Sequence, residues 1–281
     1  MAIDQPVDEH LFRIFTENFT ARDIAAALVS FDETADASEV RQFMRERRFR
    51  IVGIRREGLV VGYVRQEELD GATCGDAIHE FRDGDVVNAW SSFTRLISAL
   101  RDRERVFVRS FGQIGGLVSR SDLQKPPVRM WLFGMITIAE IFLTETIESL
   151  YPDDSWTELV SSGRMRKARE LCAERMRRQQ PVRLVDCLQV GDKMQLLIRD
   201  EEWLEEFDFS SRREGERWIK ELGSLRNNLA HAQPIVPLNW KMIAEAGRRV
   251  DRIVARIGET QPMARVRSSQ SAGGEAASDD G

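Results

Sequence analysis

The sequence predicts an α+β protein in two parts, an N-terminal α/β part followed by an all-helical part. The first half repeats one order of elements, in which a helix, a short strand and a second helix precede two strands and a short helix. The second half carries apolar residues at helical spacing. We expect an N-terminal segment at residues 1–14, the repeats at residues 15–125, the helical part at residues 126–258 and a disordered tail at residues 259–281.

The composition is typical of ordinary folded domains. Hydrophobic residues make up 42% of the 281 residues and charged residues 31%, enough for two cores with well-solvated surfaces. A net charge of −5 excludes a protein that coats nucleic acid through its overall charge. The cysteines, Cys74, Cys172 and Cys187, lack the spacing of metal ligands or of a disulfide framework. We therefore expect no metal site and a reducing cytoplasm.

A membrane location is not expected from the sequence. The N-terminus is acidic, unlike a signal peptide. The most apolar stretch, residues 130–143, is shorter than the ~20 residues that a membrane span needs, and Thr137 and Glu140 interrupt it. We interpret it as a buried helix.

The first repeat begins at Thr20, which suits the N-cap of a helix. Residues 39–44 have helical apolar spacing. Residues 49–54 alternate and are rich in β-branched side chains, so they predict a strand, and a turn at Gly58 leads into a partner strand at residues 59–64.

The second repeat follows the same plan. Its amphipathic helix at residues 93–100 places four apolar side chains on one stripe. Each repeat is too small for a comfortable domain, so two stacked copies are expected to share a core. The other predicted elements are a short helix at residues 76–81, a short strand at Val86 and Val87, and strands at residues 106–108 and 114–118 around Gly112.

Two prolines, Pro126 and Pro127, are expected to interrupt regular structure before the helical part, because proline lacks an amide donor. The helices expected after them cover residues 130–151, 156–180 with a break near Gly163, 184–197, 203–207, 214–231 and 240–257.

A short motif follows the last strand of the second repeat. Gly116 is followed by two apolar residues, then Ser119, two further residues and Asp122. A carboxylate can accept hydrogen bonds from both ribose hydroxyls, a serine hydroxyl can donate to ribose or phosphate, and glycine permits close approach of the backbone. In the first repeat, Arg65 and Glu68 stand where the serine and aspartate would be.

These repeats resemble CBS domains, which pair into a module with clefts for adenosine nucleotides. The resemblance implies a tandem CBS pair of βαββα repeats with one intact cleft, in which Gly116, Ser119 and Asp122 bind ATP, AMP or a related nucleotide. Apolar strand residues near Val87 would hold the adenine. The alternative is that Ser119 and Asp122 only cap the helix that follows, and that the pair serves as a scaffold.

A second motif lies near the end of the helix at residues 214–231. Arg226 and the polar Asn227 are followed by His231. Histidine titrates near neutral pH and can move a proton, and arginine can stabilise a phosphate that gains negative charge. On the helical part this motif resembles that of HEPN ribonucleases. The resemblance implies an all-α bundle that cuts RNA without metal, with Arg226, His231 and Asn227 as catalytic residues.

The spacing of that motif leaves two arrangements open. Five positions on an ideal helix rotate by about 140°, so Arg226 and His231 do not share one face. Either the helix ends before His231, or the site combines residues of two subunits, as the usual HEPN homodimer implies. A surface arginine and a helix-terminal histidine without catalytic function would show the same pattern.

A basic segment is a weaker candidate for RNA binding. Arg164, Arg166, Lys167 and Arg169 lie close together and could guide a phosphate backbone, or they could form a solvated helix face. Together, the two resemblances imply a homodimeric endoribonuclease of stress or defence, gated by an adenosine nucleotide, with a possible antitoxin or regulatory partner of unknown identity. The alternative is a non-catalytic nucleotide sensor or interaction scaffold.

Overall fold

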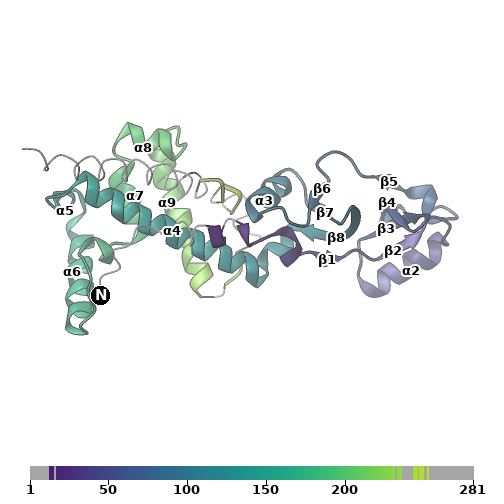
Figure 1. Cartoon of the computed structure of the whole chain (residues 1–281), viewed down its shortest axis with the longest axis horizontal. Coiled ribbons are helices and arrows are strands. Elements are labelled where there is room, and N and C mark those ends of the chain that lie inside the picture. The colour runs from purple at the N-terminus through teal and green to yellow at the C-terminus, as the bar shows by residue number, and fades with distance from the viewer. Residues whose placement is uncertain are drawn as a thin grey trace, which may run out of the picture. The chain divides into compact units, whose positions relative to one another are not determined.

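A computed structural model describes residues 13–15, 17–231, 233–235, 243–245, 247–249 and 252 of the chain. Within this part, residues 17–129 form an α/β unit, and residues 13–15 together with those from 130 onward form a helical unit (Figure 1). The domain boundary expected at residue 125 stays a prediction. The predicted tail at residues 259–281 lies outside the described residues.

The α/β unit is built from two copies of the predicted repeat. The first comprises the 3₁₀ turn η1 (Ala21–Asp23), β1 (Ala26–Ala27), β2 (Ser30–Asp32), α2 (Ala37–Arg47), β3 (Ile51–Arg56), β4 (Leu59–Arg65) and η2 (Gln66–Glu68). The second comprises η3 (Cys74–Ala77), β5 (His79–Glu80), β6 (Val86–Asn88), α3 (Phe93–Arg101), β7 (Arg105–Ser110), β8 (Gln113–Ser119) and η4 (Arg120–Gln124). The element order of the first copy therefore recurs in the second.

The two repeats exchange their first strands. β1 of the first repeat pairs antiparallel with β8, which gives a sheet of order β1-β8-β7-β6. β5 of the second repeat pairs with β4 in the same way, which gives the order β2-β3-β4-β5. Each sheet therefore needs both repeats, and this explains why the two copies form one unit.

The core of this unit has a layer inside the first repeat and a layer between the sheets. Met44 of α2 packs on Val52, Ile54 and Val64 of its own sheet. A second cluster joins Leu28 and Ile51 of the first repeat to Phe107 and Ile114 of the second. This shared cluster confirms that the repeats bury a continuous apolar surface between them.

The helical unit is organised on one long apolar helix, α4 (Pro126–Leu150). Its buried side chains include Trp131, Leu143 and Ile147. The following elements are α5 (Trp156–Leu159), α6 (Ser162–Arg177), η5 (Val185–Cys187), α7 (Val190–Leu197), α8 (Glu201–Glu206) and α9 (Arg212–Ala230), and the described residues after 242 are also helical.

Three predicted elements were wrong in detail. The helices expected at Thr20 and at residues 76–81 are 3₁₀ turns, and His79 and Glu80 belong to a strand. Pro126 and Pro127 do not interrupt the chain but begin α4. The first amides of a helix need no acceptor, so prolines are tolerated there and preset the backbone dihedral φ.

Helix α4 is longer than the apolar stretch identified in the sequence. By length and composition, its 25 residues could cross a membrane, with a mean hydropathy of 1.5 over the most apolar window. In the protein, 61% of that window is buried. A core helix passes the same test, so this is weak evidence for a membrane span.

Candidate functional site

The candidate catalytic motif lies at the C-terminal end of α9. The helix begins at Ser211, whose hydroxyl accepts a hydrogen bond from the amide of Glu214. Trp218, Leu222 and Leu225 are buried along one face at helical spacing. This face anchors α9 in the helical unit and leaves the opposite face to solvent.

Arg226, Asn227 and His231 are all exposed. α9 ends at Ala230, and His231 is its C-cap residue. Within the part of the chain that the structure describes, no hydrogen bond or ion pair occupies the side chain of any of the three. The charged and titratable groups of the motif are therefore accessible to a ligand.

The end of α9 does not bring His231 to the same side as Arg226. The amide of His231 still donates to the carbonyl of Asn227 at 3.0 Å, the spacing of a helical hydrogen bond, although His231 itself has left the helical dihedrals with φ −101° and ψ 16°. The rotation of about 140° between positions five residues apart therefore persists. The helix thus ends before His231 without bringing it beside Arg226, and a site that combines residues of two subunits stays a prediction.

A buried guanidinium group lies beside the first turn of α9. Arg249 donates to Glu214 at 2.8 Å and to the carbonyl of Asp208 at 3.2 Å, and its guanidinium lies 4.2 Å from the ring centre of Phe209. Hydrogen bonds from Ser210 and Arg249 lower the pKa of Glu214 to about 2. This contact ties residue 249 to the start of α9.

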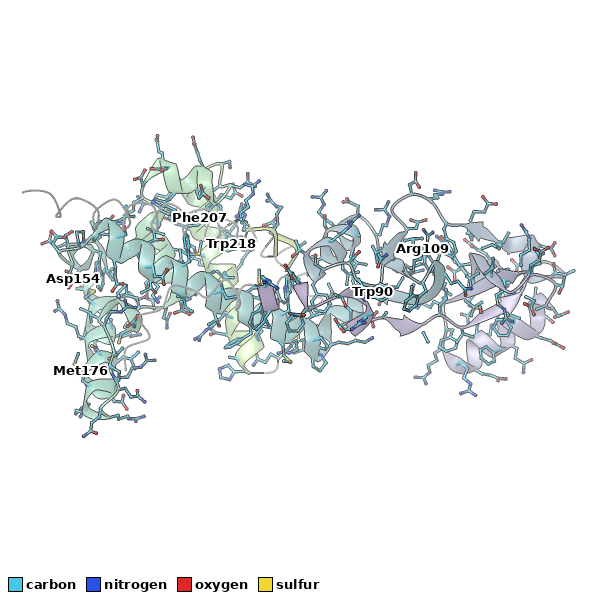
Figure 2. The ribbon with its side chains drawn as sticks, viewed as in Figure 1. Trp90, Arg109, Asp154, Met176, Phe207 and Trp218 are labelled. Carbon is cyan, nitrogen blue, oxygen red and sulfur yellow. The ribbon has the colours of Figure 1, made fainter. Side chains whose placement is uncertain are left out.

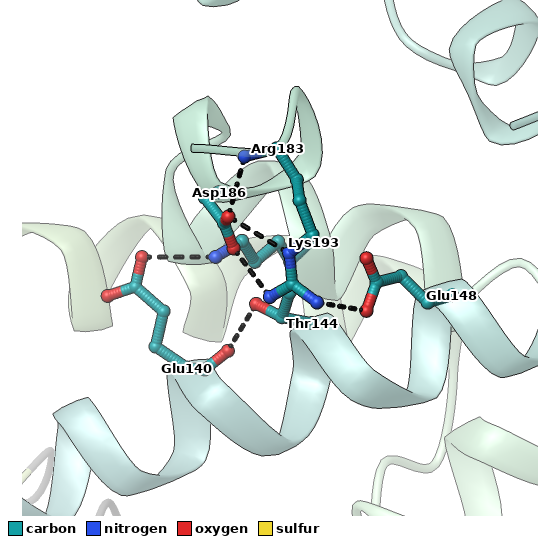
Figure 3. A network of polar contacts seen from close by, with 6 residues as sticks. All are labelled: Glu140, Thr144, Glu148, Arg183, Asp186 and Lys193. Carbon is teal, nitrogen blue, oxygen red and sulfur yellow. Dashed lines mark hydrogen bonds and ion pairs between the residues drawn. The ribbon is translucent and has the colours of Figure 1, made fainter. Parts of the chain in front are cut away.

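A polar network joins α4 to α7 (Figure 3). The ammonium of Lys193, whose side chain is only 3% exposed, lies 3.3 Å from the carboxylate of Glu140. Burial lowers the pKa of Lys193, and Glu140 opposes that shift. Arg183 bridges Asp186 at 2.9 Å and Glu148 at 2.5 Å. The network fixes the approach of α7, which in turn packs on α9 through Gly191 and Ile219.

The basic segment forms α6, which runs at a steep angle to α4 (Figure 1). Met165, Ala168 and Cys172 bury one face of this helix, and Met176 lies toward its outer end (Figure 2).

The predicted RNA-binding side chains of α6 differ in their partners. Arg164 pairs with Asp192 at 3.4 Å and Arg166 with Glu170 at 3.1 Å. Lys167 and Arg169 are exposed, and neither has an ion pair to another described residue. Part of the positive charge is thus neutralised locally, and the rest faces solvent.

In the predicted nucleotide motif, Asp122 is engaged by its neighbours. Its Oδ2 atom accepts from the amide and the hydroxyl of Ser119, both at 2.7 Å, and its Oδ1 atom lies 2.9 Å from the ammonium of Lys125. Burial would raise the pKa of Asp122, but the bonds from Lys125 and Ser119 hold it below its ordinary value. The carboxylate caps η4 and retains free lone pairs.

The equivalent position in the first repeat is Glu68. Its carboxylate bonds to His79 and lies 3.1 Å from the guanidinium of Arg65. The ring of His79 stacks on Tyr63 with the centres 5.2 Å apart. These partners of Glu68 come from within the protein, in agreement with the departure of this repeat from the motif.

Two other residues of the predicted nucleotide site lie in the sheet. Gly116 pairs with Ala27 of β1, and a Cβ at Gly116 would lie 3.0 Å from Val108 and 3.4 Å from Ala25. The close approach of Val108 on β7 and of Ala25, just before β1, therefore accounts for this glycine. Val87 is buried on β6. The structure brings Ser119 and Asp122 together, while binding of a nucleotide by these four residues stays a prediction.

Sequence reasoning missed the Glu140–Lys193 pair and Arg249. The members of the pair are 53 residues apart, and no local spacing links them. A lysine at a position with buried neighbours on α7 was the available signal, because lysine is rarely buried without a partner. In the described part of the chain, no three metal-binding side chains gather into a possible site.

Comparison with known proteins identifies the helical part. Residues 136–258 match the family model of Swt1-like HEPN domains. None of the curated proteins matches the chain.

Among solved structures, similar chains include the CBS domain of the bacterial CNNM/CorC family Mg²⁺ transporter in complex with ATP (22% identity, 42% of this chain, 92% of that chain, TM-score 0.35). Another is the CBS domain of a membrane protein from Sphaerobacter thermophilus (16%, 41% and 90%, TM-score 0.34). A third is CBSX2 of Arabidopsis thaliana in complex with AMP (15%, 37% and 93%, TM-score 0.33). The chain joins an α/β unit with the repeat order predicted for a CBS pair to a helical domain that matches the Swt1-like HEPN family.

Proposed function

We propose that this chain is a metal-independent endoribonuclease of HEPN type whose activity is regulated by an adenosine nucleotide bound to the CBS pair. The observation that carries the proposal is the exposed end of α9. There, Arg226, Asn227 and His231 are free of intramolecular partners among the described residues, within the segment that matches the HEPN family.

In the proposed reaction the 2′-hydroxyl of RNA attacks the adjacent phosphorus. The new bond between the 2′-oxygen and phosphorus forms as the bond to the 5′-oxygen breaks, which leaves a 2′,3′-cyclic phosphate and a 5′-hydroxyl. The 2′-hydroxyl gives up its proton, which His231 moves or positions, and the departing 5′-oxygen takes up a proton from His231 or from water. Arg226 stabilises the charge that develops on the phosphate, and Asn227 orients a phosphate oxygen.

The proposed active form is a cytoplasmic homodimer in which two copies of α9 meet. A dimer places Arg226 of one copy near His231 of the other, which their separation around one helix requires. The unpaired Lys167 and Arg169 on α6 would attract the RNA backbone.

The proposal is tested by incubating the purified chain with single-stranded RNA in the presence of EDTA. His231→Ala and Arg226→Ala should each lower cleavage by about 100-fold or more, in the range known for loss of acid–base or electrostatic assistance. Arg217→Ala, an exposed arginine on the same helix, is the matched control and should cut RNA at the native rate.

The alternative is a scaffold that does not cut RNA. One observation favours this alternative for the α/β unit: Asp122 is already held by Ser119 and Lys125. If the chain binds no adenosine nucleotide at millimolar concentration, the CBS pair functions only in assembly.

A further inference from the structure

Two large aromatic side chains lie exposed at one end of the second repeat. Trp90 is 46% exposed and Phe111, at the tip of the β7–β8 hairpin, is 89% exposed. Their ring centres are 5.2 Å apart in an edge-to-face arrangement. The rings therefore contact each other, and both residues remain exposed to solvent.

One arginine lies beside these rings, and a second belongs to the same end of the sheet. The guanidinium of Arg22 lies 6.0 Å from the ring centre of Trp90. Arg109 is exposed on β7, and the amide of Ala89, next to Trp90, donates to its carbonyl at 2.8 Å. Figure 2 marks Trp90 and Arg109 on the α/β unit. We call Arg22, Trp90, Arg109 and Phe111 the Trp90 surface.

The equivalent end of the other sheet offers a matched comparison, because its backbone makes the same hydrogen bonds. The amide of Arg22 donates to Ala89 at 2.9 Å, and the amide of Gly75 donates to Glu33 at 2.8 Å. Arg22 therefore occupies the position equivalent to Gly75, and Ala89 the position equivalent to Glu33. At this pair of positions, the end of the sheet β1-β8-β7-β6 has one more positive charge and one fewer negative charge than the equivalent end of the sheet β2-β3-β4-β5.

A second pair of positions shows the same difference. Asp32 lies opposite Arg55 in the sheet and forms an ion pair with it at 3.1 Å. Asn88 lies opposite Arg109 in the equivalent register. Since asparagine carries no charge, Arg109 keeps a positive charge that the first repeat neutralises, and it has no ion pair to another described residue.

The aromatic residues also have polar counterparts. Phe111 has a φ of 48° and precedes Gly112, as Glu57 with a φ of 51° precedes Gly58. Trp90 corresponds to the exposed Thr34. A bulky residue at positive φ is unfavourable, and an aromatic ring that stays in water gains nothing from burial. Phe111 is therefore unfavourable for the stability of its own turn, and its ring is exposed where a ligand can contact it.

From these contacts we infer that the Trp90 surface binds single-stranded RNA. Unpaired bases stack on exposed aromatic rings regardless of sequence, and adjacent arginines neutralise the phosphates. At the equivalent end of the other sheet, Asp32 pairs with Arg55 and Glu33 with Arg56, and no aromatic ring is exposed at the positions of Thr34 and Glu57, so the same ligand would find neither a stacking surface nor an unpaired arginine at these positions. The choice of RNA over another anionic polymer rests on the proposed function, and the surface itself is independent of the residues that would cut.

The test uses the full chain with His231→Ala, so that RNA stays intact, and a fluorescein-labelled 12-nucleotide oligouridine. Fluorescence anisotropy gives the Kd. Combined Trp90→Ala and Phe111→Ala substitutions should weaken binding about tenfold or more, within the roughly 5- to 150-fold range expected for the loss of one stacked base. Combined Thr34→Ala and Glu57→Ala substitutions, at the matched positions of the first repeat, should leave the Kd unchanged.

An unchanged Kd in the aromatic variant would overturn the inference. If the variant with the unchanged Kd also sedimented as a smaller species than the native chain, the surface would instead be a contact between two copies of the chain. Cleavage is measured separately with native His231. If RNA binding depends on Trp90 and Phe111 but the native chain does not cut RNA, the ribonuclease proposal is refuted and the binding surface is retained. If the native chain cuts RNA but the aromatic variant keeps its affinity, the binding surface is refuted and the ribonuclease proposal is retained.

Discussion

The carboxylate of Asp122 accepts hydrogen bonds from both the amide and the hydroxyl of Ser119, each at 2.7 Å. The same capping box recurs at Thr20 with Asp23 and at Thr73 with Asp76. Three turns of the α/β unit are thus closed by the same device, although the resemblance to CBS domains assigns a ligand to the third alone. The observed cap and the proposed nucleotide binding by Asp122 can be separated by comparing it with the other aspartates.

Asp122→Ala and Asp76→Ala should both lower the free energy of unfolding by about 0.5–2 kcal/mol, because each removes a cap. Asp122→Ala alone should weaken the binding of ATP or AMP, and only in this variant should the effect of nucleotide on RNA cleavage be lost. Calorimetric titration and chemical denaturation give the two quantities. Equal nucleotide affinities in both variants would mean that Asp122 serves only as a cap.

Glu140→Gln should destabilise the helical unit. It removes the carboxylate 3.3 Å from the buried ammonium of Lys193 and leaves that charge poorly compensated. A hydrogen bond to a buried charged group contributes about 1.5–3 kcal/mol, and we expect a loss of this size in urea denaturation.

The control for this change is Glu170→Gln, which breaks the exposed pair with Arg166 at 3.1 Å. Surface pairs contribute about 0–1 kcal/mol, so this variant should remain close to the native stability. If both substitutions had the same small effect, the Glu140–Lys193 pair would not hold α7 on α4.

The stability of the fold should depend on Glu214 at acid pH. The pKa of this group is about 2, below its ordinary value of 4.5, so its ionised form favours the folded state. Its contribution is fully present above pH 4.5 and is lost as the pH falls toward 2. The difference in unfolding free energy between the native chain and Glu214→Gln should therefore shrink over that window. A difference that stays constant with pH would show that the carboxylate is not selectively ionised in the folded state.

Mixing two inactive variants tests whether the site contains residues from two copies. If Arg226 acts with His231 of the partner copy, an equimolar mixture of Arg226→Ala and His231→Ala should recover about a quarter of the native activity, since half of the dimers then carry one intact pair. Cleavage rates before and after subunit exchange give the answer. A mixture that stays inactive after exchange, which light scattering can verify, would place both residues in one copy.

The longer elements of the fold were predictable because their signals are local. The hairpins at Gly58 and Gly112 follow from alternation and from turn positions with positive φ. β1 has only two residues, Ala26 and Ala27, and β5 is equally short. Such strands exist because another strand pairs with them, and no periodicity within two residues can reveal that.

For the candidate sites, the types of residue were predictable from the sequence, but their neighbours in space were not. The sequence selected Arg226 and His231, and the structure shows both exposed. It could not join Trp90 to Phe111, because the chain between them forms α3 and β7 before the rings meet. The polar network under α7 was hidden for the same reason.

The chemistry of the RNA ends produced by the native chain tests the central claim most directly. Single-stranded RNA is incubated with the protein in EDTA, and the fragments are analysed by mass spectrometry. We expect 2′,3′-cyclic phosphate and 5′-hydroxyl ends, and no cleavage at a nucleotide whose 2′-hydroxyl is replaced by hydrogen. The native chain should produce these fragments, whereas His231→Ala should not. Intact RNA, cleavage only with added metal, or fragments with 3′-hydroxyl and 5′-phosphate ends would contradict the proposed function.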